Sequence, residues 1–227
     1  MRFVFDVDGT LTPSRQRIDD EFGSWFLNWC QTHKVYLVTG SDYEKTIEQL
    51  GADICYAVNG IFNCAGNAHY IRGELQYENE FKLTTKQKTF LVGLLDYSKC
   101  PIKTGRHIEE RNGMVNFSTV GRNARLEQRE QYVKYDTETG ERRKLAKLIM
   151  EQFSDLEACI GGETGIDIYH RGRDKSQVVK HIGSFTFFGD ATYPGGNDYT
   201  IAKLAATYYQ VTRWNTTYKI LRDKYDR

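Results

Sequence analysis

Two acidic residues directly follow an apolar run near the start of the chain, in the stretch FVFDVDGTLT at residues 3–12. Asp6 and Asp8 repel one another, and burying both costs free energy unless a cation offsets their charge. The stretch therefore predicts a cation site built on these two residues. The alternative is an ordinary turn after a strand, in which the aspartate side chains bond the neighbouring backbone.

Three later stretches also place polar residues where an expected strand ends or an expected helix begins. They are VTGSD with Thr39 and Ser41, GRDKS with Lys175, and FFGDATYPGGND with Asp190. In an open parallel sheet, such groups gather at the carboxyl ends of the strands. Together with Asp6 they supply a nucleophilic carboxylate, hydroxyls that can hold a phosphate, an ammonium group and an acid suited to magnesium. These groups are the ones that phosphoryl transfer through a carboxylate requires.

The two outer parts of the chain, which must position these groups, alternate between strand and helix patterns. The predicted strands cover residues 2–7, 35–40, 54–60, 185–190 and 209–212. The predicted helices cover residues 20–33, 42–50, 175–182, 197–208 and 215–225. The Asn-Gly pair that ends the third strand predicts a hairpin into residues 61–66. The alternation is typical of an α/β fold in which helices cover both faces of a parallel sheet.

The middle of the chain has a different pattern of helices and antiparallel hairpins. Helices are predicted at residues 84–98 and 140–153, and pairs of strands at residues 106–122 and 156–170. These elements describe an α+β domain inserted into the α/β core. We expect a catalytic core formed by residues 1–81 and 170–227, with an inserted domain at residues 82–169.

Composition excludes several classes of protein. The chain has 227 residues, 40% hydrophobic and 27% charged, which is ordinary for a globular protein. A net charge of +1 argues against nucleic acid as the main partner. The five scattered cysteines form no zinc motif and indicate a reduced, cytoplasmic protein. No apolar run is long enough for a membrane span, so we expect no membrane partner.

The motifs DVDGT, TGS, DK and GD followed by ND occur in the order found in the haloacid dehalogenase (HAD) superfamily, and the chain resembles that superfamily. The insert between the second and third motifs resembles the large α+β cap of one of its classes. The resemblance implies a Rossmann-like HAD core with a parallel sheet and an inserted α+β cap.

Four longer stretches resemble the eukaryotic-type phosphomannomutases. They are DVDGTLTPSRQRI, RNGMVNFSTVGRNARLEQRE, GGETGIDIY and FFGDATYPGGND. The resemblance spans nearly the whole chain and is densest in the insert, the part that normally decides the substrate. It implies interconversion of mannose 6-phosphate and mannose 1-phosphate, in mannose metabolism and GDP-mannose biosynthesis.

The resemblance assigns roles to the residues of the core. Asp6 is the nucleophile that forms an aspartyl-phosphate, and Asp8 is the general acid and base. Lys175 pairs with Asp6 or with the transferring phosphate, whose oxygens bond Ser41 and Thr39. The implied cofactor is Mg²⁺. The ligands are Asp6, the backbone carbonyl of Asp8, and Asp190, with Asn197 and Asp198 in support.

A mutase must also hold a second, non-reacting phosphate, which calls for several cationic donors facing the catalytic aspartate. The resemblance places six residues at the phosphate and the sugar. They are Arg15, Arg111, Asn116, Arg122, Arg129 and Asp167. The alternatives are that the arginines are ordinary solvated surface and that Asp167 is a strand-end acid facing solvent.

The chain also departs from the family pattern at four positions. Gly165 stands where a serine is usual, so one hydroxyl contact to the substrate is missing. Thr39 replaces a glycine and resembles the threonine of the superfamily's phosphatases. Glu110 replaces a phenylalanine, and Arg173 a tryptophan. The missing serine hydroxyl leaves the preference between mannose and glucose phosphate open, and the four departures together fit either a divergent mutase or a mutase scaffold that acts as a phosphatase.

The predicted function is that of a phosphomannomutase acting through a hexose 1,6-bisphosphate, which also serves as activator. One alternative is a magnesium-dependent sugar-phosphate phosphatase on the same scaffold, in which water attacks the aspartyl-phosphate. Another is a non-catalytic phosphosugar-binding protein, which would need no nucleophile. A homodimer formed through the cap is implied by the resemblance alone.

Overall fold

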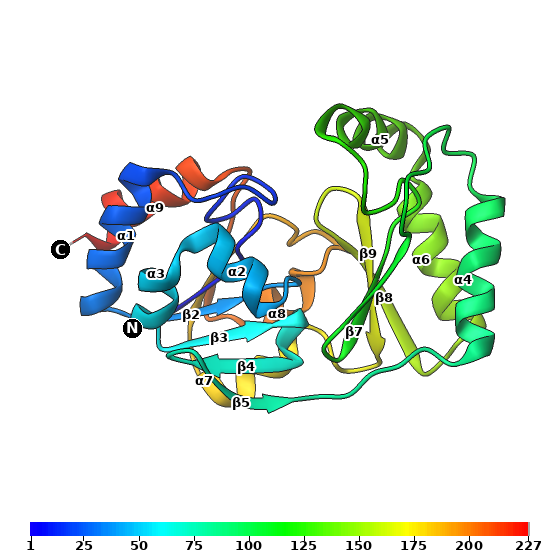
Figure 1. Cartoon of the computed structure of the whole chain (residues 1–227). Coiled ribbons are helices and arrows are strands. Elements are labelled where there is room, and N and C mark those ends of the chain that lie inside the picture. Colours follow the sequence, from blue (N-terminus) through cyan, green and yellow to red (C-terminus); the bar gives the residue numbers. More distant parts are fainter. Residues whose placement is uncertain (227) are drawn as a thin grey trace.

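The computed structural model describes residues 1–226, which form two separate sheets (Figure 1). The larger sheet has the strand order β11-β10-β1-β2-β3-β4-β5, and the smaller has the order β6-β7-β9-β8. The larger sheet consists of β1 (Arg2–Phe5), β2 (Lys34–Val38), β3 (Gly60–Asn63), β4 (Ala68–Ile71), β5 (Glu74–Glu78), β10 (Thr186–Gly189) and β11 (Thr207–Gln210). The smaller sheet consists of β6 (Ile108–Arg111), β7 (Met114–Phe117), β8 (Leu156–Gly161) and β9 (Gly165–His170).

The larger sheet is parallel from β11 to β3 and ends in the antiparallel pair β4 and β5. Parallel strands have their carboxyl ends at the same edge of the sheet. Asp6, Thr39 and Asp190 each come directly after such a strand. The topology therefore brings residues from distant parts of the sequence to one edge.

Helices cover both faces of the larger sheet, as Figure 1 shows. One face packs against α1 (Asp20–Thr32), α2 (Tyr43–Leu50), α3 (Ala52–Ala57) and α9 (Trp214–Tyr225). The other face packs against η2 (Lys175–Val178), α7 (Val179–Ile182) and α8 (Tyr199–Leu204). In α1 the apolar residues repeat at helical spacing, so that Phe22, Phe26 and Trp29 are all buried against the sheet. Because both faces are covered, the central strands β1, β3 and β10 are almost entirely buried, whereas the edge strands β5 and β11 are mostly exposed.

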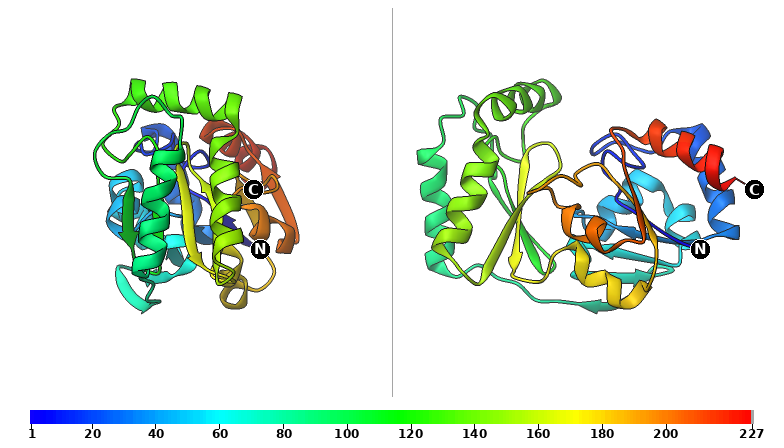
Figure 2. Two further views of the ribbon diagram at one scale, coloured as in Figure 1. Left: turned by 90° about the vertical axis from the view of Figure 1, so that its right-hand side faces the viewer. Right: turned by 180° about the vertical axis from the view of Figure 1, so that it is seen from behind.

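Two helices cover one face of the smaller sheet, and part of the other face packs against η1 (Cys64–Gly66) through Met114 and Tyr169. Val115, Phe117 and Ile168 point toward α4 (Thr85–Tyr97) and α6 (Glu141–Gln152), which lie side by side over the first face (Figure 2). In a strand, successive side chains alternate between faces. Asn116 and Asp167 therefore point the other way, toward the larger sheet. The remaining helix, α5 (Leu126–Thr139), crosses the ends of α4 and α6, and the turn η1 (Cys64–Gly66) follows β3.

The predicted α/β class with a mainly parallel sheet is confirmed, but the predicted strand at residues 54–60 is wrong. Residues 52–57 form α3, and the strand begins only at Gly60. The side chain of Asn59 accepts a bond from the backbone of Val35 at 2.8 Å, and this contact brings the chain into the sheet. A short apolar run fits a buried helix as well as a strand. The predicted hairpin turn at Asn59-Gly60 is therefore wrong as well, because β3 begins at Gly60 and pairs in antiparallel fashion with β4 beyond η1.

The predicted helix at residues 197–208 is also too long, because α8 ends at Leu204 and the chain enters β11 at Thr207. The division into a core of residues 1–81 and 170–227 and an insert of residues 82–169 stays a prediction. None of the helices formed by residues 1–226 has the length and apolar content that crossing a membrane requires.

Candidate active site

A buried ion cluster lies at the carboxyl edge of the larger sheet. The Asp6 backbone N–H donates to the carbonyl of Phe188 at 2.9 Å, which continues the parallel ladder and fixes the start of the loop. The Lys175 Nζ donates to Asp6 Oδ1 at 2.6 Å and to Asp198 Oδ1 at 2.7 Å. All three side chains are almost completely buried. One ammonium group thus ties together residues that lie 169 and 23 positions apart from it.

The cluster holds more negative than positive charge. Burial raises the pKa of Asp6 well above its usual value, and the charges of Asp198 and Asp190 raise it further, whereas Lys175 lowers it. Burial and Asp198 likewise raise the pKa of Asp190 to about 7. Burial acts to lower the Lys175 pKa, but Asp198 and Asp6 outweigh it and raise that pKa. The lysine therefore stays charged while the surplus acids lack a counter-charge.

The surplus acids fit a divalent cation. Carboxylate oxygens of Asp6, Asp190 and Asp198 lie within 4.8 Å of one another. Hard oxygen ligands of this kind are those that Mg²⁺ prefers. Gly9 has a φ of +78°, and a Cβ there would lie 2.6 Å from Asp190 Oδ2, so a glycine is required for Asp190 to reach the cluster. The acids are thus held close despite their repulsion, as a cation site requires.

Asp8 lies beside the cluster and is oriented by two donors. Its Oδ1 accepts bonds from the backbone N–H of Arg15 at 2.6 Å and from the Gln49 side chain at 2.9 Å. The Ser41 hydroxyl lies 3.5 Å from its other oxygen. The predicted alternative, an aspartate that bonds only its own turn, does not describe these long-range contacts. Sequence reasoning missed Gln49, which is buried in α2 and has no motif around it.

The loop after β2 brings two hydroxyls to the same edge. The Thr39 hydroxyl oxygen accepts a bond from the backbone N–H of Ser41 at 3.1 Å, which leaves its proton free to be donated. Both side chains line the cavity described below. Thr39 and Ser41 therefore contribute hydroxyl groups to the same cavity that Asp6 lines.

The smaller sheet and its neighbouring loops bring arginines to the opposite side. Arg111 from β6 donates through Nη1 to the Gly40 carbonyl of the larger sheet's loop at 2.6 Å. Arg129 from α5 lies 3.4 Å from the Ser14 hydroxyl through Nη2. Burial lowers the pKa of Arg15, and the charges of Arg129 and Arg111 lower it further. The predicted arginines therefore converge at one place and are not solvated surface.

Two glutamates hold these arginines. Glu109 bonds Arg111 and also Arg122, the latter at 2.9 Å. Glu163 bonds Arg129 at 2.6 Å. Neither glutamate was anticipated from the sequence. Glu109 could have been found, because it lies two positions before Arg111 on a predicted strand and therefore on the same face.

An amide joins the arginines to the buried acid of β9. The Asn116 side chain donates to Asp167 Oδ1 at 2.7 Å and accepts from Arg122 Nη1 at 3.2 Å. Asp167 is 3% exposed, so the alternative of a solvent-facing acid is wrong. A Cβ at Gly165 would lie 2.4 Å from the Asn116 Nδ2. The glycine therefore leaves room for the amide in the space that a serine would need.

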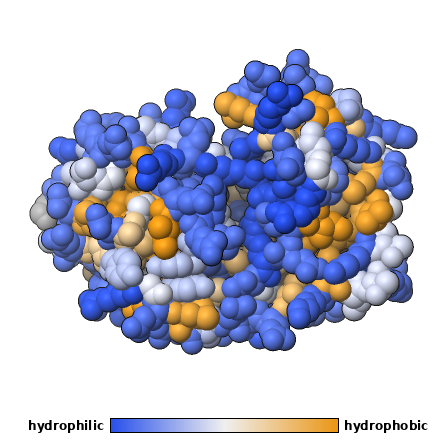
Figure 3. Space-filling view, in the orientation of Figure 1, coloured by the Kyte–Doolittle hydropathy of each residue, from blue (hydrophilic) through white to orange (hydrophobic). Residues whose placement is uncertain are grey.

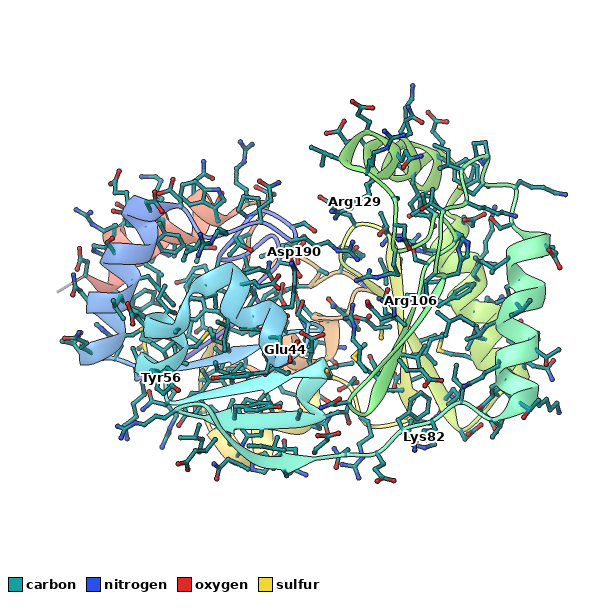
Figure 4. All side chains as sticks on the ribbon, viewed as in Figure 1. Glu44, Tyr56, Lys82, Arg106, Arg129 and Asp190 are labelled. Atoms are coloured by element: carbon teal, nitrogen blue, oxygen red, sulfur yellow. The ribbon has the colours of Figure 1, made fainter. Side chains whose placement is uncertain are left out.

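The two groups of residues enclose one cavity of about 290 Å³. The larger sheet and its loops contribute the first wall, which we call the core wall. The second, which we call the cap wall, consists of Glu109, Arg111, Asn116, Arg122, residues 161–165 and Asp167, with Arg129, which bonds Glu163, beside them. Figure 3 shows a hydrophilic notch between the two parts of the molecule. In Figure 4, Asp190 of the core wall and Arg129 of the cap wall are labelled on its two sides. Acids on one wall thus face arginines on the other.

Residues 24–226 match the family model described as eukaryotic phosphomannomutase. The chain belongs to this family. A probable phosphomannomutase from Caenorhabditis elegans is 32% identical over 214 residues, which cover 87% of this chain and 84% of the relative. A phosphomannomutase from Galdieria sulphuraria is 37% identical over 216 residues, covering 90% and 86%. The predicted membership of the phosphomannomutase family is confirmed.

Solved structures resemble the phosphomannomutase chain in fold. An IMP-nucleotidase from Plasmodium falciparum has a TM-score of 0.60 at 15% identity, over 97% of this chain and 66% of that one. A sugar phosphatase of HAD subclass IIB has a TM-score of 0.53 at 15% identity, over 91% and 85%. The predicted HAD fold is confirmed by these likenesses.

Proposed function

We propose that this chain is a phosphomannomutase that interconverts mannose 6-phosphate and mannose 1-phosphate through a hexose 1,6-bisphosphate. The observation that carries the proposal is the cavity in which Asp6, Asp8 and Asp190 face Arg111 and Arg122 of the cap wall. A mutase has to hold one phosphate at its nucleophile and a second phosphate at a distance. An acid cluster opposite an arginine cluster supplies both positions.

In the proposed reaction, an Asp6 carboxylate oxygen attacks the phosphorus of the bisphosphate. A bond forms between that oxygen and phosphorus while the bond from phosphorus to the sugar oxygen breaks. Lys175 already bonds Asp6 Oδ1 and therefore orients the carboxylate so that its other oxygen is free to attack. The hydroxyls of Ser41 and Thr39 bond the oxygens of the phosphate.

In the proposed reaction, Asp8 acts first as a general acid and then as a general base. As the sugar oxygen leaves, Asp8 donates a proton to it, and it later takes a proton from the hydroxyl of the incoming sugar phosphate. The donors at Asp8 Oδ1, the Arg15 backbone and Gln49, fix one oxygen and leave Oδ2 as the proton-carrying atom. The sugar phosphate then receives the phosphoryl group from Asp6, which restores the enzyme.

We propose Asp6, the backbone carbonyl of Asp8, and Asp190 as ligands of Mg²⁺, with Asn197 and Asp198 in support. When bound, the ion offsets the charge of the carboxylates and of the phosphate. Asp198 supports this arrangement by bonding Lys175 and accepting a bond from the backbone of Ala191 at 3.2 Å. The raised pKa of Asp190 is consistent with an acid that awaits a cation.

The cap wall holds the distal phosphate and the sugar in this proposal. Among residues 1–226, Nε of Arg122 and Nε of Arg129 are buried and have no hydrogen-bond partner. An unpaired buried donor costs free energy, and a phosphate oxygen would satisfy it. Asp167, fixed by Asn116, is placed to bond sugar hydroxyls. Arg15 completes the cationic set from the side of the core wall.

We further propose that hexose 1,6-bisphosphate activates the enzyme by phosphorylating Asp6, and that the protein is a cytoplasmic homodimer formed through the inserted region. The activator follows from the reaction, because Asp6 must carry a phosphate before it can meet a monophosphate. The dimer is tested by sedimentation equilibrium of the purified chain.

Phosphorus NMR of the purified protein tests the proposed reaction. The sample holds magnesium, mannose 1-phosphate and a trace of glucose 1,6-bisphosphate. We expect mannose 6-phosphate without free phosphate, and no product from the Asp6→Asn variant. Free phosphate in place of mannose 6-phosphate would mean that water reaches Asp6 and that the chain is a sugar-phosphate phosphatase. Repeating the experiment with glucose 1-phosphate measures the sugar preference.

A further inference from the structure

Glu109 contacts three arginines at once. Its Oε2 accepts bonds from Arg111, through Nε at 3.0 Å and through Nη2, and from Arg122 Nη2 at 2.9 Å. Its Oε1 accepts from Nη2 of Arg106, labelled in Figure 4, at 3.3 Å. One oxygen therefore holds two like-charged guanidinium groups side by side. Without a shared anion these groups would repel one another.

Glu109 lies on the cavity side of β6, whereas its neighbour Glu110 lies on the opposite side. Glu109 and Arg111 both line the cavity, as alternation along a strand requires. Glu110 instead bonds Lys88 of α4 at 2.6 Å and is half exposed. The two adjacent carboxylates thus have the same chemistry in different surroundings, and only the first faces a bound substrate.

The Glu109 carboxylate uses the same donors that a phosphate would need. A phosphate that approaches Arg111 and Arg122 finds these groups already paired and meets a negative charge beside them. Charge-assisted bonds to guanidinium groups are among the strong hydrogen bonds of proteins. A carboxylate in this place therefore lowers the affinity of the arginine cluster for phosphate while keeping the arginines in position.

We propose that Glu109 is a positioning residue of the distal-phosphate subsite. Glu109 keeps Arg111 and Arg122 in position when no phosphate is bound, and its negative charge lowers the affinity of these arginines for a bound phosphate. This inference rests on the proposed function. The bisphosphate intermediate has to release its distal phosphate from the arginines, because the sugar must turn before that phosphate can reach Asp6. An arginine cluster without an opposing charge would hold the distal phosphate too tightly for this release. Glu109 thus favours release and turnover over tight binding.

Titration of inorganic phosphate by calorimetry, in buffer with EDTA and without magnesium, tests the proposal directly. Glu109→Gln keeps an oxygen that can bond both arginines and removes the negative charge. We expect it to bind phosphate about tenfold more tightly than the unmodified chain, because a like charge near the anion is gone. The matched control is Glu110→Gln, which changes the net charge equally and should leave phosphate affinity within about twofold.

Affinity that is unchanged or weaker in Glu109→Gln, or no binding to either protein, would overturn the proposal. The Arg122→Ala variant shows where the phosphate binds. If the measured heat comes from the distal-phosphate subsite, this variant should bind phosphate more weakly than the unmodified chain. A residue that merely supports the fold would lower phosphate affinity and the unfolding midpoint together. Glu109→Gln should leave the midpoint within about 2 °C while affinity rises.

Kinetics separate this inference from the proposed function. In the mutase assay, Glu109→Gln should lower both KM and kcat for mannose 1-phosphate, since the bound ester leaves more slowly. If the unmodified chain shows no mutase activity while phosphate still binds more tightly to the variant, the proposed function fails together with the role of Glu109 in turnover, and only its effect on phosphate affinity stands. If the mutase is active and phosphate affinity does not rise, the role of Glu109 fails alone.

Discussion

The two walls of the cavity hold their charges in different ways. On the core wall, Lys175 bonds both Asp6 and Asp198, and the side chains of Asp6, Lys175 and Asp198 are 6%, 1% and 0% exposed. On the cap wall, the arginines pair with Glu109 and Glu163, whose side chains are 20% and 45% exposed. Both walls thus pair opposite charges, but these pairs are buried on the core wall and partly exposed to solvent on the cap wall.

This difference separates two tasks. Buried ions cannot exchange partners with water, so the core wall has its geometry set before a substrate arrives, as bond making requires. Partly exposed pairs are weaker and can exchange one anion for another. The cap wall is therefore suited to hold a phosphate and to let it go. The following changes test this contrast, from the largest expected effect to the smallest.

Replacing the proposed nucleophile should abolish the reaction. Asp6→Asn keeps the size of the side chain and removes the attacking oxygen, so we expect turnover to fall by about 10⁴-fold or more. Turnover is measured by phosphorus NMR and the fold by circular dichroism. Appreciable residual turnover with a normal spectrum would show that Asp6 is not the nucleophile.

Removing the shared lysine should destabilise the core wall. Lys175→Met leaves Asp6 and Asp198 buried without their partner, and the loss of one member of a buried ion pair costs about 3–5 kcal/mol. Urea unfolding measures the loss. The control is Lys147→Met, because Lys147 is 74% exposed and lies 3.6 Å from Glu151 in a surface pair. Equal losses in the two variants would contradict the contrast between the walls.

Removing an arginine of the cap wall should affect substrate holding more than bond making. Arg122→Ala should lower mutase kcat/KM by about 10- to 100-fold, the value of charge-assisted bonds to one phosphate. Hydrolysis of a small aryl phosphate, which has no distal phosphate, should fall less. Arg143→Ala, at an exposed position of α6, is the control. Equal losses in both assays would argue against a distal-phosphate role.

Restoring the family's serine should disturb the cap wall locally. Gly165→Ser places a Cβ where the Asn116 amide now lies, so the amide must move away from Asp167 and Arg122. We expect KM for mannose 1-phosphate to rise about 3- to 10-fold, with kcat for the bound ester less affected. Gly93→Ser is the control, because a Cβ at Gly93 meets nothing within 4 Å. An unchanged KM would mean that Asn116 does not hold the sugar site.

Mild acid should destabilise the larger sheet at a point remote from both walls. Burial lowers the pKa of His69 to about 4, and the charge of His181 acts in the same direction. The unfolded chain takes up this proton near pH 6.5, so stability should fall by about 1–3 kcal/mol between pH 6.5 and 4 and level off below. Urea unfolding at several pH values checks this. In the His69→Gln variant, the free energy of unfolding should change less with pH between 6.5 and 4. An unchanged pH dependence would mean that other groups cause the loss of stability.

Sequence patterns predicted most of the fold because the apolar periodicities are strong. Helix α1 and the strand before Asp6 lie where the spacing of aromatic and β-forming residues places them. The failure at residues 54–60 has a physical cause, since the five-residue apolar stretch at 54–58 satisfies the pattern of a buried helix and of a strand alike. Pairing with β2, which decides between the two, is a long-range contact that no local pattern contains.

The sequence by itself determined which chemical groups this protein has and the order in which they occur. Asp6, Lys175 and Asp190 each stand at the end of a strand or the start of a helix, and parallel strands necessarily bring such positions to one edge. Only the tertiary structure decided the partners of these groups. Lys175 bonds Asp6 and Asp198, and Glu109 bonds Arg111 and Arg122, because side-chain pairing depends on distances in space. Burial, which sets the strength of each pair, likewise arises only when the strands and helices pack together.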